Sequence, residues 1–447
     1  MHLHAQPGQG ALTLAQVLEA AKAHYPAIKA ALAEQQAAQN AVGLARTAYL
    51  PHAEILWQTN RATANNVYGL LLPQSVIPNI SGPVIAADNA RSAWSSGTGA
   101  LVNWQPFDFG VRSAQVDAAR RGNEAATAAS AVTMLEVTAS AGSSFFDLAA
   151  AEQLLVVAQA NVKRYEAFAR AVHVLVENQL RPGADASQAD AQLAQARNQL
   201  IQAETQQAVR RAALAEFLGV VGSQVAIDAS AVMAGAPASD LEAKAATSHP
   251  SVLEENALSL QQIAQKRVLD RSYVPSFATL GAVSGRGAGT GLTGHFPGGT
   301  AGLAPDTFNW ALGVQVTFSA FDFFGLHEQK KIQDAKIEAE HARYDASLTR
   351  VSAAQEQARA TLNGARQIAA NTPAELAAAR ASEQQQQARY RSALATVVDV
   401  SAAEGVLAQA EADDAIARLG VWRAELGVAA AQGDLQPFVQ LLEAKGK

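Results

Sequence analysis

Apolar and polar residues alternate strictly in the stretch FNWALGVQVTFS, which covers residues 308–319. The even-numbered positions are large and apolar, and the odd-numbered positions are small or polar. Alternation with a period of two places unlike side chains on opposite faces of a β-strand. The pattern therefore predicts a long strand with one apolar face. That face comprises Phe308, Trp310, Leu312, Val314, Val316 and Phe318.

Three more stretches are predicted as strands, although the alternation in the third of the four is weak. The four strands are expected near residues 52–64, 93–106, 275–286 and 308–320. No helix adjacent in sequence is available to cover their apolar face. An uncovered face of this kind marks an interaction surface or a membrane contact. Because four strands cannot close a barrel, several chains would have to share one.

Most of the remaining chain has the pattern of long helices rich in alanine and glutamine. Large or small apolar residues recur every seven positions, which is typical of coiled-coil packing. Two such series are Leu148, Leu155, Val162, Ala169 and Val176, and Ile332, Ala339, Ala346, Ala353 and Ala360.

The chain consists of two copies of one unit. Pro26 and Pro51 flank a predicted helix, and Pro250 and Pro275 flank another with the same separation. Each copy reads helix, strand, loop, strand, long helix, turn and helix. We expect tails at residues 1–10 and 434–447, a first repeat at 11–233 with long helices over 111–218, and a second repeat at 234–433 with long helices over 326–427.

An aspartate precedes a long predicted helix in each repeat. Asp108 lies in QPFDFG, and Asp322 lies in SAFDFFG. A carboxylate at a helix N-terminus accepts hydrogen bonds from free backbone N–H groups and complements the helix dipole. We expect both residues to be helix caps.

Composition limits the chemistry of the protein. The formal charge is −6, and there is no cysteine, which excludes disulfides and thiolate sites. We expect no transmembrane helix, because no run of 18 apolar residues occurs. The first residues lack the basic and apolar regions of a signal peptide, and we expect that a signal peptide has been removed.

The sequence predicts no enzyme, no metal site and no cofactor. The segment GTGLTG has the spacing of a dinucleotide-binding loop, but HFPGGT follows it and prevents the helix that such a site requires. The histidines are scattered, and the motifs of zinc proteases, P-loop nucleotide-binding proteins and serine hydrolases are missing from the sequence.

Three ordered motifs resemble the TolC-like outer membrane efflux family. They are LTLAQVLEAAKAHYPAIKAA near the start, QPFDFGVRSAQVDAAR in the first repeat, and RYRSALATVVDVSAAEGVLAQAEADDAIARLGVWRAELG late in the chain. The resemblance runs from about Leu12 to Gly427. It implies a mainly α fold with a transmembrane β part. Three chains would each contribute four strands to a 12-stranded barrel and their long helices to a coiled-coil barrel.

The resemblance also implies candidate gate residues. Asp399 occupies a position where family members often carry an aspartate at the periplasmic tip, and three copies would form an acidic ring. Tyr390 corresponds to a tyrosine that helps to hold the closed state. Asp185 is the counterpart of Asp399 in the first repeat and is either a gate residue, a helix cap or an adaptor contact. The alternative for Asp399 is a solvent-exposed cap of a helix that starts near Ser401.

The predicted function is a passive, trimeric exit duct of a tripartite efflux system in a Gram-negative bacterium. It would lie in the outer membrane, extend into the periplasm and carry drugs or metal ions outward. Its partners would be a membrane-fusion adaptor and an inner-membrane pump, of the RND type or the ABC type. The alternatives are a duct for type I protein secretion and a soluble coiled-coil scaffold or periplasmic adaptor.

Overall fold

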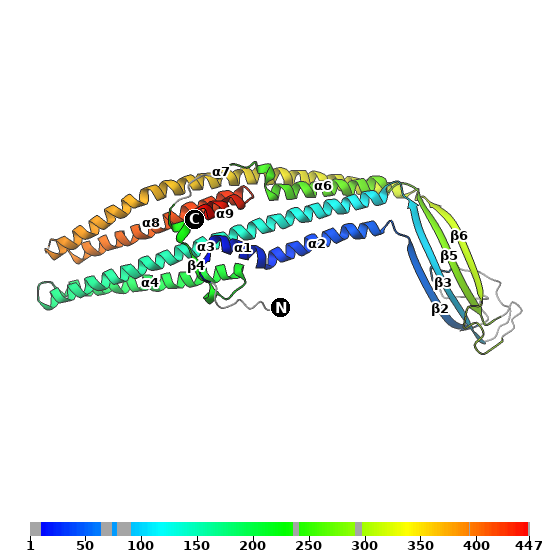
Figure 1. Cartoon of the computed structure of the whole chain (residues 1–447), viewed down its shortest axis with the longest axis horizontal. Helices are drawn as coiled ribbons and strands as arrows, with labels where there is room; N and C mark the ends of the chain where they lie inside the picture. Colours follow the sequence, from blue (N-terminus) through cyan, green and yellow to red (C-terminus); the bar gives the residue numbers. More distant parts are fainter. Residues whose placement is uncertain are drawn as a thin grey trace. The chain divides into compact units, whose positions relative to one another are not determined.

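Long helices and long strands follow one another in an order that occurs twice along the chain (Figure 1). The computed structural model describes residues 10–63, 74–77, 91–235, 241–290, 297–392 and 394–445. In each half, a helix precedes two antiparallel strands, and two longer helices follow them. The mainly helical fold with a β part is therefore confirmed.

The main elements have the following bounds. The helices are α1 (Leu14–His24), α2 (Pro26–Thr47), α3 (Val111–Glu177), α4 (Gly183–Leu218), α5 (Ser230–Met233), α6 (Pro250–Arg271), α7 (Asp322–Arg391), α8 (Val397–Ala431) and α9 (Gln436–Lys445). The long strands are β2 (His52–Thr63), β3 (Ser92–Phe107), β5 (Ser276–Ala288) and β6 (Thr307–Thr317). Two short strands, β1 (Leu12–Thr13) and β4 (Ile227–Asp228), pair in parallel.

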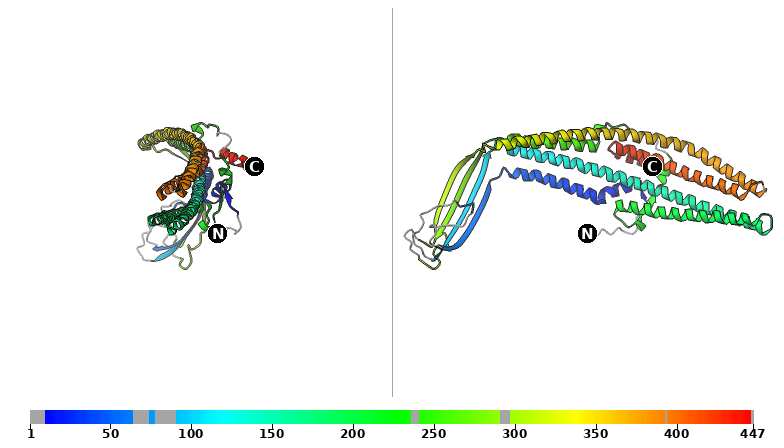
Figure 2. Two further views of the ribbon diagram at one scale, coloured as in Figure 1. Left: turned by 90° about the vertical axis from the view of Figure 1, so that its left-hand side faces the viewer. Right: turned by 180° about the vertical axis from the view of Figure 1, so that it is seen from behind.

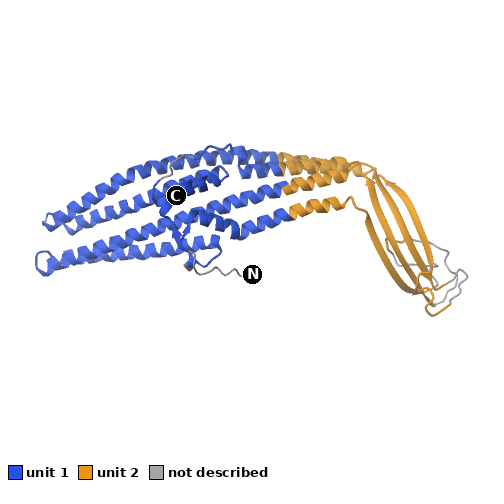
Figure 3. Cartoon of the chain, viewed as in Figure 1, with its two compact units in different colours: residues 1–36, 124–257, 340–447 blue, residues 37–123, 258–339 orange. Residues whose placement is uncertain are grey.

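The chain divides into two compact units (Figure 3). Residues 1–36, 124–257 and 340–447 form one, which we call the hairpin unit. Residues 37–123 and 258–339 form the other, which we call the sheet unit. Both units combine segments from both sequence repeats, so neither repeat folds as a separate domain.

Two helical hairpins dominate the hairpin unit, where α3, α4, α7 and α8 run alongside one another (Figures 1 and 2). The helix α3 ends in a Schellman motif: Leu180 N donates to Leu175 O at 2.8 Å, and Gln179 N donates to Val176 O at 2.9 Å. Gln179 adopts a left-handed conformation with φ 57°. The turn reverses the chain before Pro182 and Gly183 begin α4.

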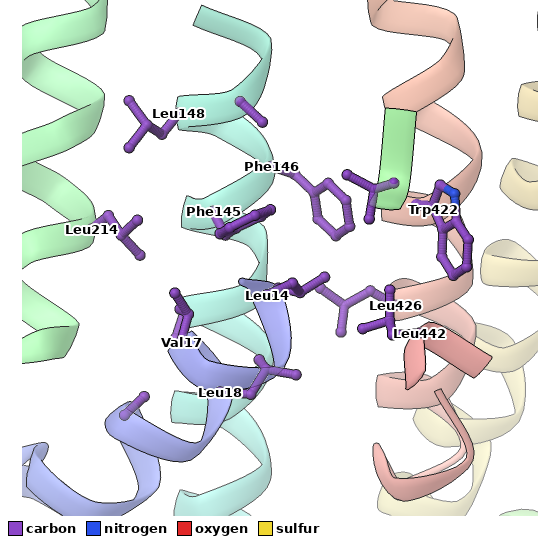
Figure 4. Packing of buried hydrophobic residues seen from close by; sticks show 14 of the residues in the cluster. Leu14, Val17, Leu18, Phe145, Phe146, Leu148, Leu214, Trp422, Leu426 and Leu442 are labelled. Carbon is purple, nitrogen blue, oxygen red and sulfur yellow. The ribbon is translucent and has the colours of Figure 1, made fainter. Parts of the chain in front are cut away.

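The core of the hairpin unit lies where α1, α3, α4, α8 and α9 meet (Figure 4). Phe145, Phe146 and Trp422 are fully buried in it, and Trp422 Nε1 donates to Gly235 O at 2.8 Å. Gly142 permits this close packing, because a Cβ there would lie 2.8 Å from a methyl group of Leu426. Burial of large side chains from distant segments provides the main hydrophobic stabilisation of the unit.

Two findings in the hairpin unit differ from the sequence predictions. Residues 434–447, expected as a tail, contain α9, and its Phe438 is fully buried against Trp422. The other expected tail lies almost wholly outside the described residues. In addition, α3 is long and apolar enough to cross a membrane by length and composition alone. Burial accounts for part of this composition, because Phe145 and Phe146 belong to the core.

The sheet unit contains a four-stranded antiparallel sheet in the order β2-β3-β5-β6. The strands begin and end within three residues of the predicted limits. A bulge interrupts the pairing between Trp104 and Phe107. β2 and β6 are the edge strands of this sheet, so each has one backbone edge without a strand partner within the described chain.

The register aligns the apolar positions of all four strands on one face. Directly paired residues share a face, and Trp310 pairs with Val283, Val283 with Ala100, and Ala100 with Ile55. Trp310 is 80% exposed and Ile55 is 87% exposed. The sheet therefore presents a continuous row of apolar side chains that nothing in the described chain covers.

The opposite face of the sheet carries most of the polar side chains. Asn309 pairs with Ser284, and Arg286 pairs with Thr307 on one side and Gly97 on the other. Gln58 follows on β2, opposite Gly97. The alternation read from one strand is thus continued across the sheet.

The N-terminal turn of α3 is hydrogen-bonded to the residues that follow α2. Asp108 Oδ2 accepts hydrogen bonds from Arg112 N and Arg112 Nε, both at 2.7 Å. Arg112 in turn donates to Ala48 O at 3.2 Å and lies over the ring of Tyr49. In the second repeat, Asp322 is itself the first residue of α7.

Candidate gate at the hairpin tips

The tip between α7 and α8 is shaped by a capping box. Thr396 is the N-cap of α8, and its backbone N and Oγ1 both donate to Asp399 Oδ2 at 2.7 Å. Asp399 N donates back to Thr396 Oγ1 at 3.2 Å. Each residue thereby satisfies a backbone N–H that the helix leaves free.

Asp399 is exposed, and its carboxylate belongs to a helix that begins at Val397. Two hydrogen bonds lower the pKa of Asp399. The one from the Thr396 backbone has the larger effect, and the one from the Thr396 side chain has the smaller. Asp399 therefore stays ionised at pH values where an ordinary aspartate begins to take up a proton. The residue is both a cap and a fixed negative charge at the tip.

Tyr390 lies on the last turn of α7 and is buried, unlike Asp399. Its ring packs edge-on against Phe168 of α3, with centroids 5.4 Å apart. Burial raises the pKa of Tyr390, as does the charge of Asp185, whereas the cation of Arg181 lowers it. The phenol Oη has no hydrogen-bond partner within the described part of the chain.

Arg181 connects the two tips. Its guanidinium carbon lies 4.5 Å from the centre of the Tyr390 ring, a cation–π geometry. Its Nη2 donates to Tyr390 O at 3.0 Å and to Ala395 O at 3.4 Å. The cation thus binds the carbonyl of Tyr390 at the C-terminal end of α7, where the helix dipole is negative, and the carbonyl of Ala395 in the turn before α8.

Asp185 lies in the first turn of α4 and is half-buried. Its position differs from that of an N-cap, because Pro182 is the N-cap and makes no side-chain capping bond. Asp185 is close enough to Tyr390 for its charge to act on the phenol.

The structure therefore brings Tyr390, Asp185 and Arg181 together, whereas the Asp399 carboxylate accepts its described hydrogen bonds from Thr396. Sequence reasoning did not identify Arg181 or Phe168. Arg181 is separated from Tyr390 by 209 residues. The one sequence feature that pointed to this site was the equivalent position of Asp185 and Asp399 in the two repeats.

A groove of about 590 Å³ lies between α3, α4 and α8. Its described lining is dominated by small residues and glutamines, and includes Ala196, Gln199, Ala402 and Gly405. No charged side chain appears among the described lining residues. The groove offers helix-packing surface and amide groups.

Residues 17–220 match the family model described as outer membrane efflux protein. This match, together with the shared fold described below, supports the predicted resemblance to the TolC-like family, whose members are outer membrane channels. The family consists of channels rather than enzymes.

Solved structures share the fold over nearly the whole chain. The outer membrane protein VceC from Vibrio cholerae has a TM-score of 0.74 at 18% identity, covering 94% of this chain and 96% of that chain. The CmeC outer membrane channel of Campylobacter jejuni has a TM-score of 0.74 at 13% identity, covering 100% and 94%. The open state of the MtrE outer membrane channel of Neisseria gonorrhoeae has a TM-score of 0.73 at 17% identity, covering 94% and 89%. No curated protein sequence matches the chain.

Proposed function

We propose that three copies of this chain form a passive exit duct for small molecules, drugs or metal ions, across the outer membrane. Each copy contributes its four strands to a shared 12-stranded barrel, and its hairpins extend into the periplasm. The observation that carries this proposal is the sheet itself. It has an apolar face without cover and two edge strands, β2 and β6, each with an open edge in the described chain.

An uncovered apolar face and open sheet edges both cost free energy in water, and assembly in a bilayer removes both costs. Unpaired backbone groups at a sheet edge require partners, and inside a membrane they require them from protein. A β2 edge of one copy that pairs with the β6 edge of the next supplies those partners. The row from Trp310 to Ile55 then contacts lipid, while Arg286, Asn309 and Gln315 face a watery lumen.

The hairpin tips supply the gate in this proposal. The contacts of Arg181 with Tyr390 and Ala395 hold one hairpin against the other, with Asp185 beside them. Three copies of Asp399 form an acidic ring, which favours cations at the constriction. Opening would loosen these contacts between hairpins rather than refold the helices.

Partners complete the system. An adaptor would bind the hairpins, and an inner-membrane pump, of the RND type or alternatively the ABC type, would supply energy. The family match to efflux proteins favours small-molecule export over protein secretion. A pump that co-purifies with the protein identifies the class directly.

Site-directed labelling tests the proposal, because the chain has no native cysteine. Single cysteines replace alternate residues of β6 in liposome-reconstituted protein and carry an environment-sensitive fluorophore. We expect lipid contact at Trp310 and Leu312 and water contact at Asn309 and Ala311. Water contact at all four positions, or a stable monomer in buffer without detergent, contradicts the proposal and favours a soluble scaffold.

A further inference from the structure

Glu404 is a carboxylic acid in an unusual position. It lies on α8, seven residues after the hairpin tip ends at Val397, and its side chain is 0% exposed. Carboxylates are almost never fully buried unless they are paired and hydrogen-bonded. Its pairing therefore determines whether it carries a charge.

The partners of Glu404 do not compensate a full negative charge. Arg164 Nε of α3 lies 3.0 Å from Glu404 Oε2, but without the alignment of a hydrogen bond. Gln387 Nε2 of α7 donates to Oε1 at 3.1 Å. Arg164 also contacts Glu411, with Nη1 3.0 Å from Oε2, so one cation is divided between two acids.

A second acid competes with Glu404 from the facing helix. Glu383 of α7 is 8% exposed, and its charge acts on the carboxyl group of Glu404. Like charges close together disfavour the ionised form, so the charge of Glu383 favours a proton on Glu404. The other charged or titratable groups facing the pair are Arg164 and Tyr165 on α3, Arg380 on α7 and Glu411 on α8.

These surroundings favour the neutral acid. Burial and then the charge of Glu383 raise the pKa of Glu404, Arg164 opposes them, and the net result is a pKa of about 7. The group therefore titrates near neutral pH while the helices stay packed. Any conformation that hydrates Glu404 returns its pKa toward the ordinary value of 4.5.

We propose that Glu404 and Glu383 form a proton-operated latch between α8 and α7. With Glu404 protonated, the buried acid and its hydrogen bond from Gln387 hold the two helices together next to the tip. When the proton is lost, the charges of Glu404 and Glu383 lie buried near Arg164, which Glu411 also binds. The helices then separate so that water can hydrate the two charges. The segment released first is the tip that carries Tyr390 and Asp399.

The direction of the effect follows from linkage. An acid whose pKa is raised in the packed state stabilises that state at low pH. The stabilisation decreases as pH rises from the hydrated value of 4.5 to the packed value of about 7. Packing is therefore tight in acid and loosens toward pH 8. The prediction that conductance changes with pH rests on the proposed function. The prediction that helix packing changes with pH does not.

A second buried acid on the same helix provides a matched control. Glu425 is also 0% exposed, but Arg366 of α7 pairs with its Oε1 at 2.6 Å. Arg366 is bound to this carboxylate in a direct hydrogen bond. A neutral glutamine at this position removes a buried carboxyl without touching the acid pair.

Hydrogen–deuterium exchange of the full chain in detergent tests the latch between pH 5.5 and 8.5, after correction for the intrinsic pH dependence of exchange. In the wild type, we expect exchange of peptides covering residues 380–404 to increase several-fold, with a midpoint near pH 7. Glu404→Gln mimics the protonated acid and should keep exchange low throughout. Glu425→Gln should leave the midpoint within a few tenths of a unit.

Glu383→Gln provides an independent test should Glu404→Gln fail to fold. Removal of the neighbouring charge should lower the midpoint by about one pH unit or more. The latch is wrong if the wild type shows no step in this range, or if Glu404→Gln retains the step.

Conductance in planar bilayers, measured on the same proteins, should rise with the same midpoint. A step in exchange without any conductance rejects the duct and keeps the latch.

Discussion

The guanidinium group of Arg181 lies 4.5 Å from the ring centre of Tyr390 and donates to its carbonyl oxygen at 3.0 Å. The two residues belong to different repeats and different hairpins. Their contact is the most direct polar link between the described tips of α3/α4 and α7/α8. We therefore expect this contact to resist separation of the two tips.

Arg181→Ala should loosen the tip. The substitution removes a cation–π contact worth about 0.5–1 kcal/mol and hydrogen bonds from a charged donor worth about 1.5–3 kcal/mol, although partial exposure reduces both. We expect higher spontaneous channel opening in planar bilayers. Arg197→Ala is the control, because Arg197 makes an exposed ion pair with Glu166 on the same hairpin. Equal opening in both variants argues against a specific link.

Asp399→Asn should reduce cation selectivity while the helix cap is largely kept, because asparagine is also a good cap-region acceptor. Thr396→Ala is the complementary variant. It removes the capping partner at a cost of about 1 kcal/mol and leaves the charge in place. Reversal potentials in a salt gradient separate the two. The acidic ring is excluded if Asp399→Asn changes no reversal potential.

The charge of Asp399 should persist into acid. Its pKa is lowered by the Thr396 backbone first and by the Thr396 side chain second. A depressed carboxyl pKa contributes stability above the unfolded value of 3.8, and that contribution is lost as pH falls through the lower folded value. Cation selectivity should therefore be retained at pH 4, where an ordinary aspartate is partly protonated. In Thr396→Ala, selectivity should decline at a higher pH.

Trp310→Arg should impair assembly much more than Asn309→Arg. An arginine on the lipid face of a barrel costs about 2–4 kcal/mol near the bilayer midplane, whereas the lumen face accommodates it. The two residues are adjacent on one strand, so strand propensity and position are matched. The yield of folded oligomer on semi-native gels measures the difference. Similar yields contradict the assignment of the apolar face to lipid.

Gly142→Val should destabilise the hairpin unit by about 1–3 kcal/mol, because it overpacks a close helix contact. A Cβ at this position would lie 2.8 Å from Leu426 and 3.2 Å from Leu18. Gly364→Ala is the control on α7, where a Cβ meets nothing within 4 Å. That change should stabilise by about 0.5–1 kcal/mol through helix propensity. Thermal unfolding in detergent measures both.

Much of the fold was predictable because it is periodic. Alternation identified β6 and its apolar residues, and seven-residue spacing identified the long helices. Phe438 falls outside this logic. It lies in the expected C-terminal tail, but it is fully buried because its ring packs against Trp422.

The candidate gate was predictable only in part. Asp399 and Tyr390 were identified by resemblance, but Arg181 and Phe168 were not, because their contacts join segments from different repeats. The acid pair of Glu404 and Glu383 was not identified either. On the sequence, nothing distinguishes them from the other glutamates of α7 and α8.

The sequence by itself determined where the chain forms helices and strands, that the pattern occurs twice, and which strand face is apolar. These properties depend on local backbone preference and on side-chain periodicity, which are written along the chain. Only the tertiary structure decided which charges share a buried space and which tips touch. Those facts depend on distances between residues far apart in sequence, and the ionisation of Glu404 depends on water exclusion that no local pattern encodes.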